Sequence, residues 1–375
     1  MRIGIDVTPA LEPHSGMRRY VELLLGALAR IDAENEYFMY AAFWRGCPGR
    51  LGGLNLPAAG NFHMETWRVP QRLALPAEHF LGLALHERRL KPLRLDLFHG
   101  AGNILPRLRR LRSVVTIHHL GGNPGSDSRW RRFYFGAQTV RSLRAADRVI
   151  AISEATRREV IGAGAPPGRV TRVYYGGADP VFSPGAPGAP PPGVRGRYIL
   201  FVSSIQERKN LGVLARAFAL WKKREESRGF QLVFAGTKGP YFRALLGLCR
   251  ELGLEGDVLF LDGATQDQLV GLYRGAELLA YPSKLEGFGL PVLEAMACGI
   301  PVVAADVSSL PEIAGEAGVL APPDSPEAFA DAFSRVVKDA GLRKDLARKG
   351  LERARRFSWE TAARETLEVY RQALS

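Results

Sequence analysis

The sequence predicts an α/β protein with two doubly wound, Rossmann-like domains that face each other across a cleft. Three observations lead to this prediction. Short apolar segments alternate with amphipathic ones, as in parallel sheets with helices on both faces. The alternation starts a second time after a stretch rich in proline and glycine. The chain has 375 residues, whereas a single hydrophobic core seldom serves more than about 250–300 residues.

The first series of elements covers the N-terminal half of the chain. It begins with a strand at 3–7 and a helix at 17–30, and further strands are expected near 37–43, 62–67, 96–99, 113–118 and 147–152. We therefore assign residues 1–182 to an N-terminal domain.

The linker is expected at 183–197, because proline and glycine take eight of the eleven positions from 183 to 193 and no regular element can run through them. The second series then gives strands at 198–202, 231–235, 258–261, 278–281 and 301–304, with helices from about 210, 241 and 265 and at 291–298. We assign residues 198–358 to a C-terminal domain and 359–375 to a final helix.

Composition excludes several classes of protein. The chain is 46% apolar and 24% charged, as globular proteins are. No apolar run reaches 18 residues and the first strand starts at once, so we expect neither a spanning helix nor a signal peptide, and a cytoplasmic location. The three cysteines are widely spaced, and all seven histidines precede residue 120 without a metal-ligand spacing. We therefore expect no bound metal.

The net charge of +13 lies mainly in the N-terminal half. Residues 1–180 hold 26 Lys+Arg against 15 Asp+Glu, whereas residues 181–375 hold 25 against 23. Arg129, Arg131 and Arg132 belong to the densest part, with aromatic residues at helical spacing among them. Such a helix suits an anionic membrane surface, at the inner face of the membrane, or an acidic acceptor. The alternative is a solvated helix face; nucleic acid is not expected, because no recognition motif accompanies the charge.

Two carboxylates lie eight residues apart in the segment 282–299. Pro291 suits the start of a short helix and Gly299 its end, and two further glycines let the preceding loop approach a ligand. Glu286 in the loop and Glu294 in the first helical turn can each accept hydrogen bonds from a vicinal diol, as sugars carry. The alternative for Glu294 is a solvated acid favoured by the helix dipole.

Two cations follow the strand at 198–202. Arg208 and Lys209 stand just before a helix that Asn210 would cap, which suits a diphosphate. A surface pair at an ordinary helix start is the alternative. In the N-terminal half, His118 stands at the carboxyl end of the strand at 113–118, where side chains point into a ligand cleft. A histidine of the core or rim is the alternative there.

Together these segments resemble the retaining glycosyltransferases of family 4 (group 1), most of all the mannosyl-transferring members. The family motif R-K-N-L is present at 208–211, I-H-D at 117–119 with His119 in place of the Asp, and G-x-G-R-Y near the N-terminus with Arg18 in place of the second Gly. The motif E-x-G-F-G-x-x-x-x-E, followed by A-x-A-x-G-x-P-V-V, is matched by Glu286, Gly287, Phe288, Gly289, Glu294, Ala295, Ala297, Gly299, Pro301, Val302 and Val303.

The resemblance implies the GT-B fold, with an acceptor-binding N-terminal domain, a nucleotide-sugar-binding C-terminal domain and a last helix that returns to the N-terminal domain. It implies that Glu294 binds the ribose, Glu286 the sugar hydroxyls and Lys209 the diphosphate, while His118 positions the sugar. The catalytic residues are then His118, Glu286 and Lys209. The donor-binding set is Gly16, Ser204, Arg208, Lys209, Glu286, Gly287, Phe288, Gly289, Leu290 and Glu294, where Ser204 replaces an arginine that many members have.

The expected activity is transfer of a hexose, with retention, from a nucleotide-diphosphate sugar to an acceptor hydroxyl. GDP-mannose is the favoured donor, UDP-sugars come next, and the acceptor is a glycan or lipid-linked sugar of cell-surface polysaccharide or glycolipid synthesis. No Asp-x-Asp pair is present to hold a metal-bound donor, so turnover is expected without metal or other cofactor. Two alternatives stay open: a nucleotide-sugar 2-epimerase of the same fold, and a non-catalytic subunit that binds sugar nucleotides.

Overall fold

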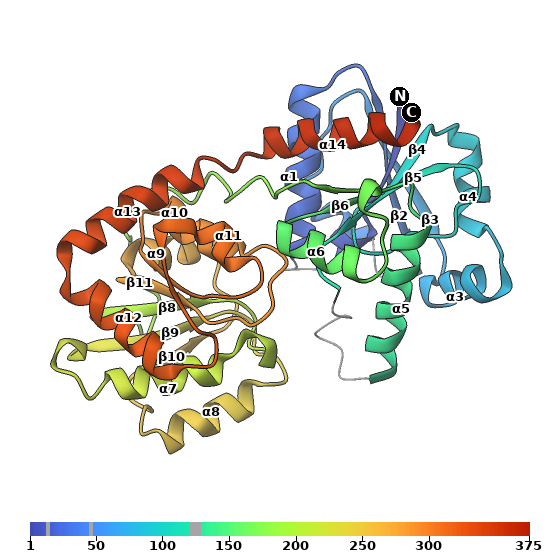
Figure 1. Cartoon of the computed structure of the whole chain (residues 1–375). Coiled ribbons are helices and arrows are strands. Elements are labelled where there is room, and N and C mark those ends of the chain that lie inside the picture. Colours follow the sequence, from blue (N-terminus) through green and yellow to red (C-terminus); the bar gives the residue numbers. More distant parts are fainter. Residues whose placement is uncertain (13–15, 45–47, 121–128) are drawn as a thin grey trace. The chain divides into compact units, whose positions relative to one another are not determined.

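The computed structural model describes residues 1–12, 16–44, 48–120 and 129–375, without the side chains at 48–49, 71–72, 79 and 129–135. The described residues form two compact units (Figure 1). The N-terminal unit holds the residues up to Gly176 together with Ser358–Ser375, and the C-terminal unit holds Gly177–Phe357. In the segment predicted as a linker, residues 183–196 lie in no helix or strand, whereas its last residue, Arg197, is the first residue of a strand.

The described part of the N-terminal unit is built on a seven-stranded parallel sheet in the order β3-β2-β1-β4-β5-β6-β7. Its strands are β1 (Arg2–Asp6), β2 (Glu36–Phe43), β3 (Phe62–Arg68), β4 (Leu97–Gly100), β5 (Arg112–Ile117), β6 (Arg148–Ala151) and β7 (Val170–Arg172). Its helices are α1 (Gly16–Ile31), α2 (Pro48–Gly52), α3 (Gln71–Leu81), α4 (Leu85–Leu90), α5 (Arg129–Ala145), α6 (Glu154–Gly162) and α14 (Trp359–Leu374).

The C-terminal unit contains a six-stranded parallel sheet in the order β10-β9-β8-β11-β12-β13. Its strands are β8 (Arg197–Val202), β9 (Phe230–Ala235), β10 (Val258–Leu261), β11 (Leu278–Tyr281), β12 (Val302–Ala305) and β13 (Gly318–Ala321). Its helices are α7 (Leu211–Trp221), α8 (Phe242–Glu251), α9 (Gln266–Gly275), α10 (Leu290–Ala297), α11 (Leu310–Ala314), α12 (Pro326–Lys338) and α13 (Ala340–Ala354).

Both sheets have the strand order of a doubly wound fold, so the predicted class is confirmed for each unit. Their central strands are buried on both faces and read as continuous apolar runs, as parallel strands do. The prediction missed the edge strands β7 and β13. Each has only three or four residues and is only partly buried, so its apolar pattern is weak.

The last helix, α14, belongs to the N-terminal unit although it follows the C-terminal unit in the chain. It lies beside α1, and Figure 1 shows this red helix next to the blue one. Ser358 caps α14 by accepting a hydrogen bond from the amide of Thr361. Gly176 is required at this place, because a Cβ there would lie 2.2 Å from the Cα of Trp359. The chain that leaves the N-terminal unit at Gly176 therefore packs, backbone against backbone, on the chain that returns to it at Trp359.

Candidate active site

The candidate residues of the C-terminal unit lie at the point where its strand order reverses. Lys209 follows β8, and Glu286 follows β11, the next strand of the sheet. In doubly wound sheets the loops that follow two such strands lie at the same edge, where ligands bind. The sheet thus brings together residues that are 77 positions apart in the chain.

Lys209 and Glu286 form a buried ion pair. The ammonium donates a hydrogen bond of 2.6 Å to Oε1 of Glu286 and one of 3.0 Å to the hydroxyl of Tyr281, the last residue of β11. Lys209 is 4% exposed, so the alternative of a surface pair is wrong. Burial alone would raise the pKa of Glu286, but the attraction of Lys209 and Arg208 outweighs it and holds that pKa below its ordinary value. The carboxylate is therefore ionised.

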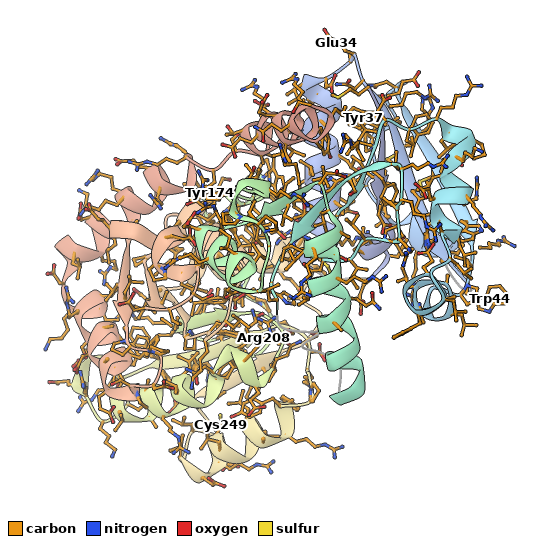
Figure 2. All side chains as sticks on the ribbon, turned by 45° about the vertical axis from the view of Figure 1, so that its right-hand side comes forward. Glu34, Tyr37, Trp44, Tyr174, Arg208 and Cys249 are labelled. Carbon is orange, nitrogen blue, oxygen red and sulfur yellow. The ribbon has the colours of Figure 1, made fainter. Side chains whose placement is uncertain are left out.

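This arrangement leaves capacity for a phosphate. An ammonium has three N–H donors, and two of them are used by Glu286 and Tyr281. Burial lowers the pKa of Lys209, and Glu286 opposes that change. Arg208, labelled in Figure 2, lies 3.8 Å from Oε2 of Glu286 and donates to the carbonyl of Leu285 at 3.0 Å. Two cations thus surround one carboxylate, which makes the local charge positive.

Two serines fix the loop that carries Glu286. The hydroxyl of Ser308 accepts from the amide of Glu286 at 3.2 Å and donates to its carbonyl at 2.7 Å. The hydroxyl of Ser309 lies 2.8 Å from the carbonyl oxygen of Phe288, whose ring packs against Phe357. Gly289 has φ of +107°, which few side chains tolerate, and α10 begins at the next residue, Leu290. The backbone around Glu286 is therefore held from both sides.

Glu294 lies in the second turn of α10, not in its first turn as predicted, because the helix begins at Leu290. It is 2% exposed, so the alternative of a solvated acid is also wrong. Its Oε2 accepts a hydrogen bond of 2.7 Å from the hydroxyl of Tyr273 on α9. A buried carboxylate that is oriented in this way has further lone pairs, which can accept from a diol.

Asn210 does not cap α7, contrary to prediction. It has a left-handed backbone conformation, and its side-chain amide donates to the carbonyls of Pro282 and Pro323, at 3.2 and 2.6 Å. The amide thus ties the loop after β8 to the loops after β11 and β13. Asn210 thus positions the Lys209 backbone indirectly.

Ser204 lies in a loop that packs against two glycines. A Cβ on Gly236 would lie 2.0 Å from the carbonyl oxygen of Ser203, and one on Gly239 would lie 2.3 Å from that of Ile205. The two loops are further joined by a hydrogen bond of 2.9 Å from the amide of Ile205 to the carbonyl of Thr237. The segment at Ser204 is therefore fixed in place without the arginine of the family pattern.

His118 in the N-terminal unit is buried, at 4% exposure. Its Nε2 is 2.7 Å from the carbonyl oxygen of Ala101, and its Nδ1 contacts the hydroxyl of Tyr175. Because a carbonyl can only accept, Nε2 carries the proton and Nδ1 accepts from Tyr175. Burial lowers the pKa of His118 to about 4. The ring is thus neutral at pH 7 in a single tautomer, and its predicted contact with a sugar stays a prediction.

A second buried histidine lies near by on β4. The Nδ1 of His99 is 2.7 Å from the hydroxyl of Tyr370 on α14, and its Nε2 is 2.8 Å from Oγ1 of Thr116. The hydroxyl of Tyr20 on α1 lies 3.0 Å from the same Oγ1, and the ring of Tyr20 stacks on Tyr175. Burial lowers the pKa of His99 to about 3. A neutral network therefore joins α1, β4, β5 and α14.

The remaining predicted residues are less constrained. Gly16 is the first residue of α1, and a Cβ there would meet no atom within 4 Å, so the protein itself does not require glycine. Arg18, which replaces a family glycine, pairs with Glu22 at 3.1 Å and donates to the carbonyl of Gly53. It thus serves packing. The backbones of Arg129, Arg131 and Arg132 lie in α5, but their side chains are outside the described residues.

Several residues of the site were missed by the sequence analysis: Tyr175, Tyr273, Tyr281, Ser308 and Ser309. Only Tyr281 gave a signal, since it is a polar group at the carboxyl end of an apolar strand. The others come from elements that the motifs do not include, and only the folded chain brings them to the site.

Comparison with known proteins agrees with this geometry. The family model described as "Glycosyl transferases group 1" matches residues 190–353, and the model "Glycosyltransferase Family 4" matches residues 14–177. A D-inositol 3-phosphate glycosyltransferase of Actinosynnema mirum is 38% identical over 410 aligned residues, which cover 99% of this chain and 96% of the relative. The chain belongs to the group 1 glycosyltransferases.

Two further proteins extend the comparison of this glycosyltransferase. O-antigen chain mannosyltransferase B of Escherichia coli is 29% identical, over 99% of this chain and the whole of the relative. The crystal structure of HepE from Anabaena, in complex with UDP-glucose, has a TM-score of 0.71 and 19% identity, with 99% of both chains covered. At this identity the likeness concerns the fold, which is GT-B.

Two searches of the described residues add to this. No helix among them is both long and apolar enough to cross a membrane. In the same part of the chain, no three His, Cys, Asp or Glu side chains are grouped so that they could hold a metal ion.

Proposed function

We propose that this glycosyltransferase moves a hexose, with retention, from a nucleotide-diphosphate sugar to an acceptor hydroxyl, and that the donor is GDP-mannose. The observation that carries the proposal is the buried Lys209–Glu286 pair at the sheet's switch point, with Glu294 on the following helix. The full-length likeness to a mannosyltransferase supports mannose, and the neighbour solved with UDP-glucose supports the class of donor.

In the proposed reaction the acceptor oxygen forms a bond to the anomeric carbon on the face from which the diphosphate departs. The bond between that carbon and the β-phosphate oxygen breaks, the phosphate keeps the electron pair, and a β-phosphate oxygen takes the acceptor proton. The ammonium of Lys209, with Arg208 near by, offsets the charge that develops on the diphosphate. Glu286 would accept from sugar hydroxyls and Glu294 from the ribose.

We further propose an anionic or lipid-linked acceptor of cell-surface polysaccharide or glycolipid synthesis, met at the inner face of the membrane. The N-terminal half carries an excess of eleven positive charges, from 26 Lys+Arg against 15 Asp+Glu. A relative that aligns with 99% of the chain is named for an anionic compound, D-inositol 3-phosphate. Arg129, Arg131 and Arg132 are the residues that we propose for this contact.

The test combines binding with turnover. Thermal unfolding is measured with GDP, UDP and ADP, since a ligand at 100 times its dissociation constant stabilises by about 2.7 kcal/mol. The protein is then incubated with the matching mannose and glucose donors and a simple acceptor, and the anomer of the product is read by NMR. Selective stabilisation by GDP and a product of retained configuration are expected. An inverted product, or stabilisation by no nucleotide, would refute the proposal.

A further inference from the structure

The exposed large apolar side chains are concentrated in one part of the N-terminal unit. Among the described residues, six of the seven lie between positions 44 and 83, and the seventh is Val181 of the C-terminal unit. The six are Trp44, Met64, Leu73, Phe80, Leu81 and Leu83. Scattered single residues of this kind are normal on a protein surface, whereas a group on neighbouring elements marks a binding surface.

The helix α3 exposes its largest described apolar side chains, although the small Ala74 is buried. Leu73 and Phe80, which are seven residues apart and so lie on one face, are 68% and 77% exposed. The opposite side buries Glu78 completely, and Glu78 accepts from the amides of His86 and Arg107 at 2.7 and 3.2 Å. Since a surface helix of a globular protein normally turns its apolar face inward, the outward face of α3 suits an apolar environment.

A basic loop is fixed beside this helix. Oε1 of Glu87 on α4 accepts from the amides of Arg109, Arg110 and Leu111, at 3.1, 2.7 and 3.1 Å. The guanidinium of Arg109 donates to the carbonyl of Gly82, one residue after α3 ends, at 2.7 Å. Arg109 and Arg110 are both exposed. The guanidinium of Arg109 is thus held next to the exposed end of α3, and Arg110 follows it in the same loop.

The surrounding sequence is strongly basic. Residues 68–112 hold ten Lys+Arg against three Asp+Glu, a balance of +7, and two of the three acids, Glu78 and Glu87, are used by the amides described above. Trp44 belongs to the same region. Its neighbour Phe43 accepts a hydrogen bond, through its carbonyl, from the amide of Val69, which lies two residues before α3 begins. Figure 2 shows Trp44 at the outer edge of its unit.

We propose that the outward face of α3, with Trp44 and the loop at 107–110, binds the surface of an anionic lipid bilayer. Phe80 and Leu81 enter the boundary between headgroups and acyl chains, and Arg109 and Arg110 contact lipid phosphates, the combination that interfacial helices use. A second copy of the chain is a poor occupant, because a symmetric contact would bring two surfaces of the same charge together. The inference adds α3 to the membrane contact that we propose for α5, and it does not depend on the donor.

The experiment measures flotation of the full chain with vesicles of phosphatidylcholine, with and without phosphatidylglycerol. Changing Phe80 and Leu81 to Ser is expected to weaken binding to anionic vesicles about tenfold or more, since each apolar side chain loses its burial. Changing Arg109 and Arg110 to Ser is expected to weaken it about fivefold per cation, and only for the anionic vesicles. Matched controls are Val181→Ser and Arg216→Ser, exposed side chains of the C-terminal unit.

Three further readouts make the test decisive. The α3 variants are expected to keep the thermal midpoint and the nucleotide affinity of the parent, because the changed side chains are exposed; this also separates the inference from the proposed function. The fluorescence of Trp44 is expected to shift to the blue on anionic vesicles, with Trp44→Phe as the reference. Equal binding to both vesicle types would overturn the proposal. A dimer of the parent protein that dissociates only when the α3 residues are changed would also overturn it, because the face would then bind a second copy. Loss of binding only when Arg129, Arg131 and Arg132 are changed to Ser would return the contact to α5.

Discussion

The buried polar groups around the candidate-site residues of the two units differ in charge. In the C-terminal unit, Lys209 and Glu286 are ionised and paired, with Arg208 near by. In the N-terminal unit, His99 and His118 are neutral, and each ring bonds at both nitrogens to groups of its own unit. A buried ion pair is costly unless its geometry is good, whereas a satisfied neutral network keeps its partners in one arrangement. The ion pair of the C-terminal unit can respond to a charged ligand, whereas the neutral network of the N-terminal unit provides a fixed surface.

The largest effect is expected when the ion pair is broken. Lys209→Met leaves the Glu286 carboxylate buried without its main partner, which typically costs about 3–5 kcal/mol of stability. It also removes the charge that we propose for the diphosphate, for which a loss of turnover of about 10²–10³-fold is expected. Denaturant unfolding and single-turnover rates are the measurements.

The matched control for this variant is Lys222→Met. Lys222 pairs with Asp257 at 3.0 Å in the same unit, with side chains that are 23% and 37% exposed, and a pair that water reaches contributes only about 0–1 kcal/mol. If both lysine variants lost the same stability, the buried pair would not have the special role assigned to it.

The neutral histidines predict a pH dependence. The pKa of His99 is lowered to about 3, so between that value and the ordinary pKa of about 6.5 the unfolded chain binds a proton that the folded chain does not. Stability should therefore fall as pH falls below about 6.5, by about 3 kcal/mol at pH 4 for one histidine. In His99→Gln the free energy of unfolding should depend less steeply on pH. The measurement is the unfolding transition of the N-terminal unit over a pH series. His63→Gln, an exposed position on β3, is the control, and identical slopes in both variants would contradict the assignment.

A smaller effect is expected from Glu294→Gln. A hydrogen bond to a charged group contributes roughly 1.5–3 kcal/mol, so nucleotide affinity should fall about 10–100-fold while the fold is kept. Tyr273→Phe removes the hydrogen bond to Glu294 but not the carboxylate, and should change affinity much less. Calorimetric titration with the nucleotide measures both, and an unchanged dissociation constant in Glu294→Gln would remove Glu294 from the site.

No effect is expected from chelation. If Lys209 and Arg208 supply the positive charge that a metal ion supplies elsewhere, turnover should be the same with and without EDTA. Activity that EDTA abolishes and manganese or magnesium restores would show that the ion pair is not sufficient.

The sequence was informative where one short motif contained the chemistry. Glu286 and Glu294 lie in one string, and Lys209 directly precedes a helix, so their part in a common site could be predicted. The partners that orient them could not, because Tyr273 and Ser309 come from other elements and are ordinary residues in their own segments. The edge strands β7 and β13 were too short to give a pattern.

Helix α3 was missed for a different reason. Its large apolar residues are exposed, whereas Ala74 and the carboxylate of Glu78 are buried, so the usual amphipathic signal is weakened, and Pro76 interrupts it further. Asn210 is an intermediate case, since its residue type suggested a cap whereas the left-handed backbone gave its amide other partners. Local preference fails at such positions because tertiary contacts decide the outcome.

The position of α14 has a consequence for synthesis. His99 and its partner Tyr370 are separated by 271 residues. A ribosome adds about 5–20 residues per second, so the synthesis of this stretch takes roughly 14 to 54 s. During that interval the whole C-terminal unit is translated and can fold, while the face of α1 that α14 covers is still open. The unit that is translated first is therefore the last to be completed, and it is the one for which a nascent chain needs protection.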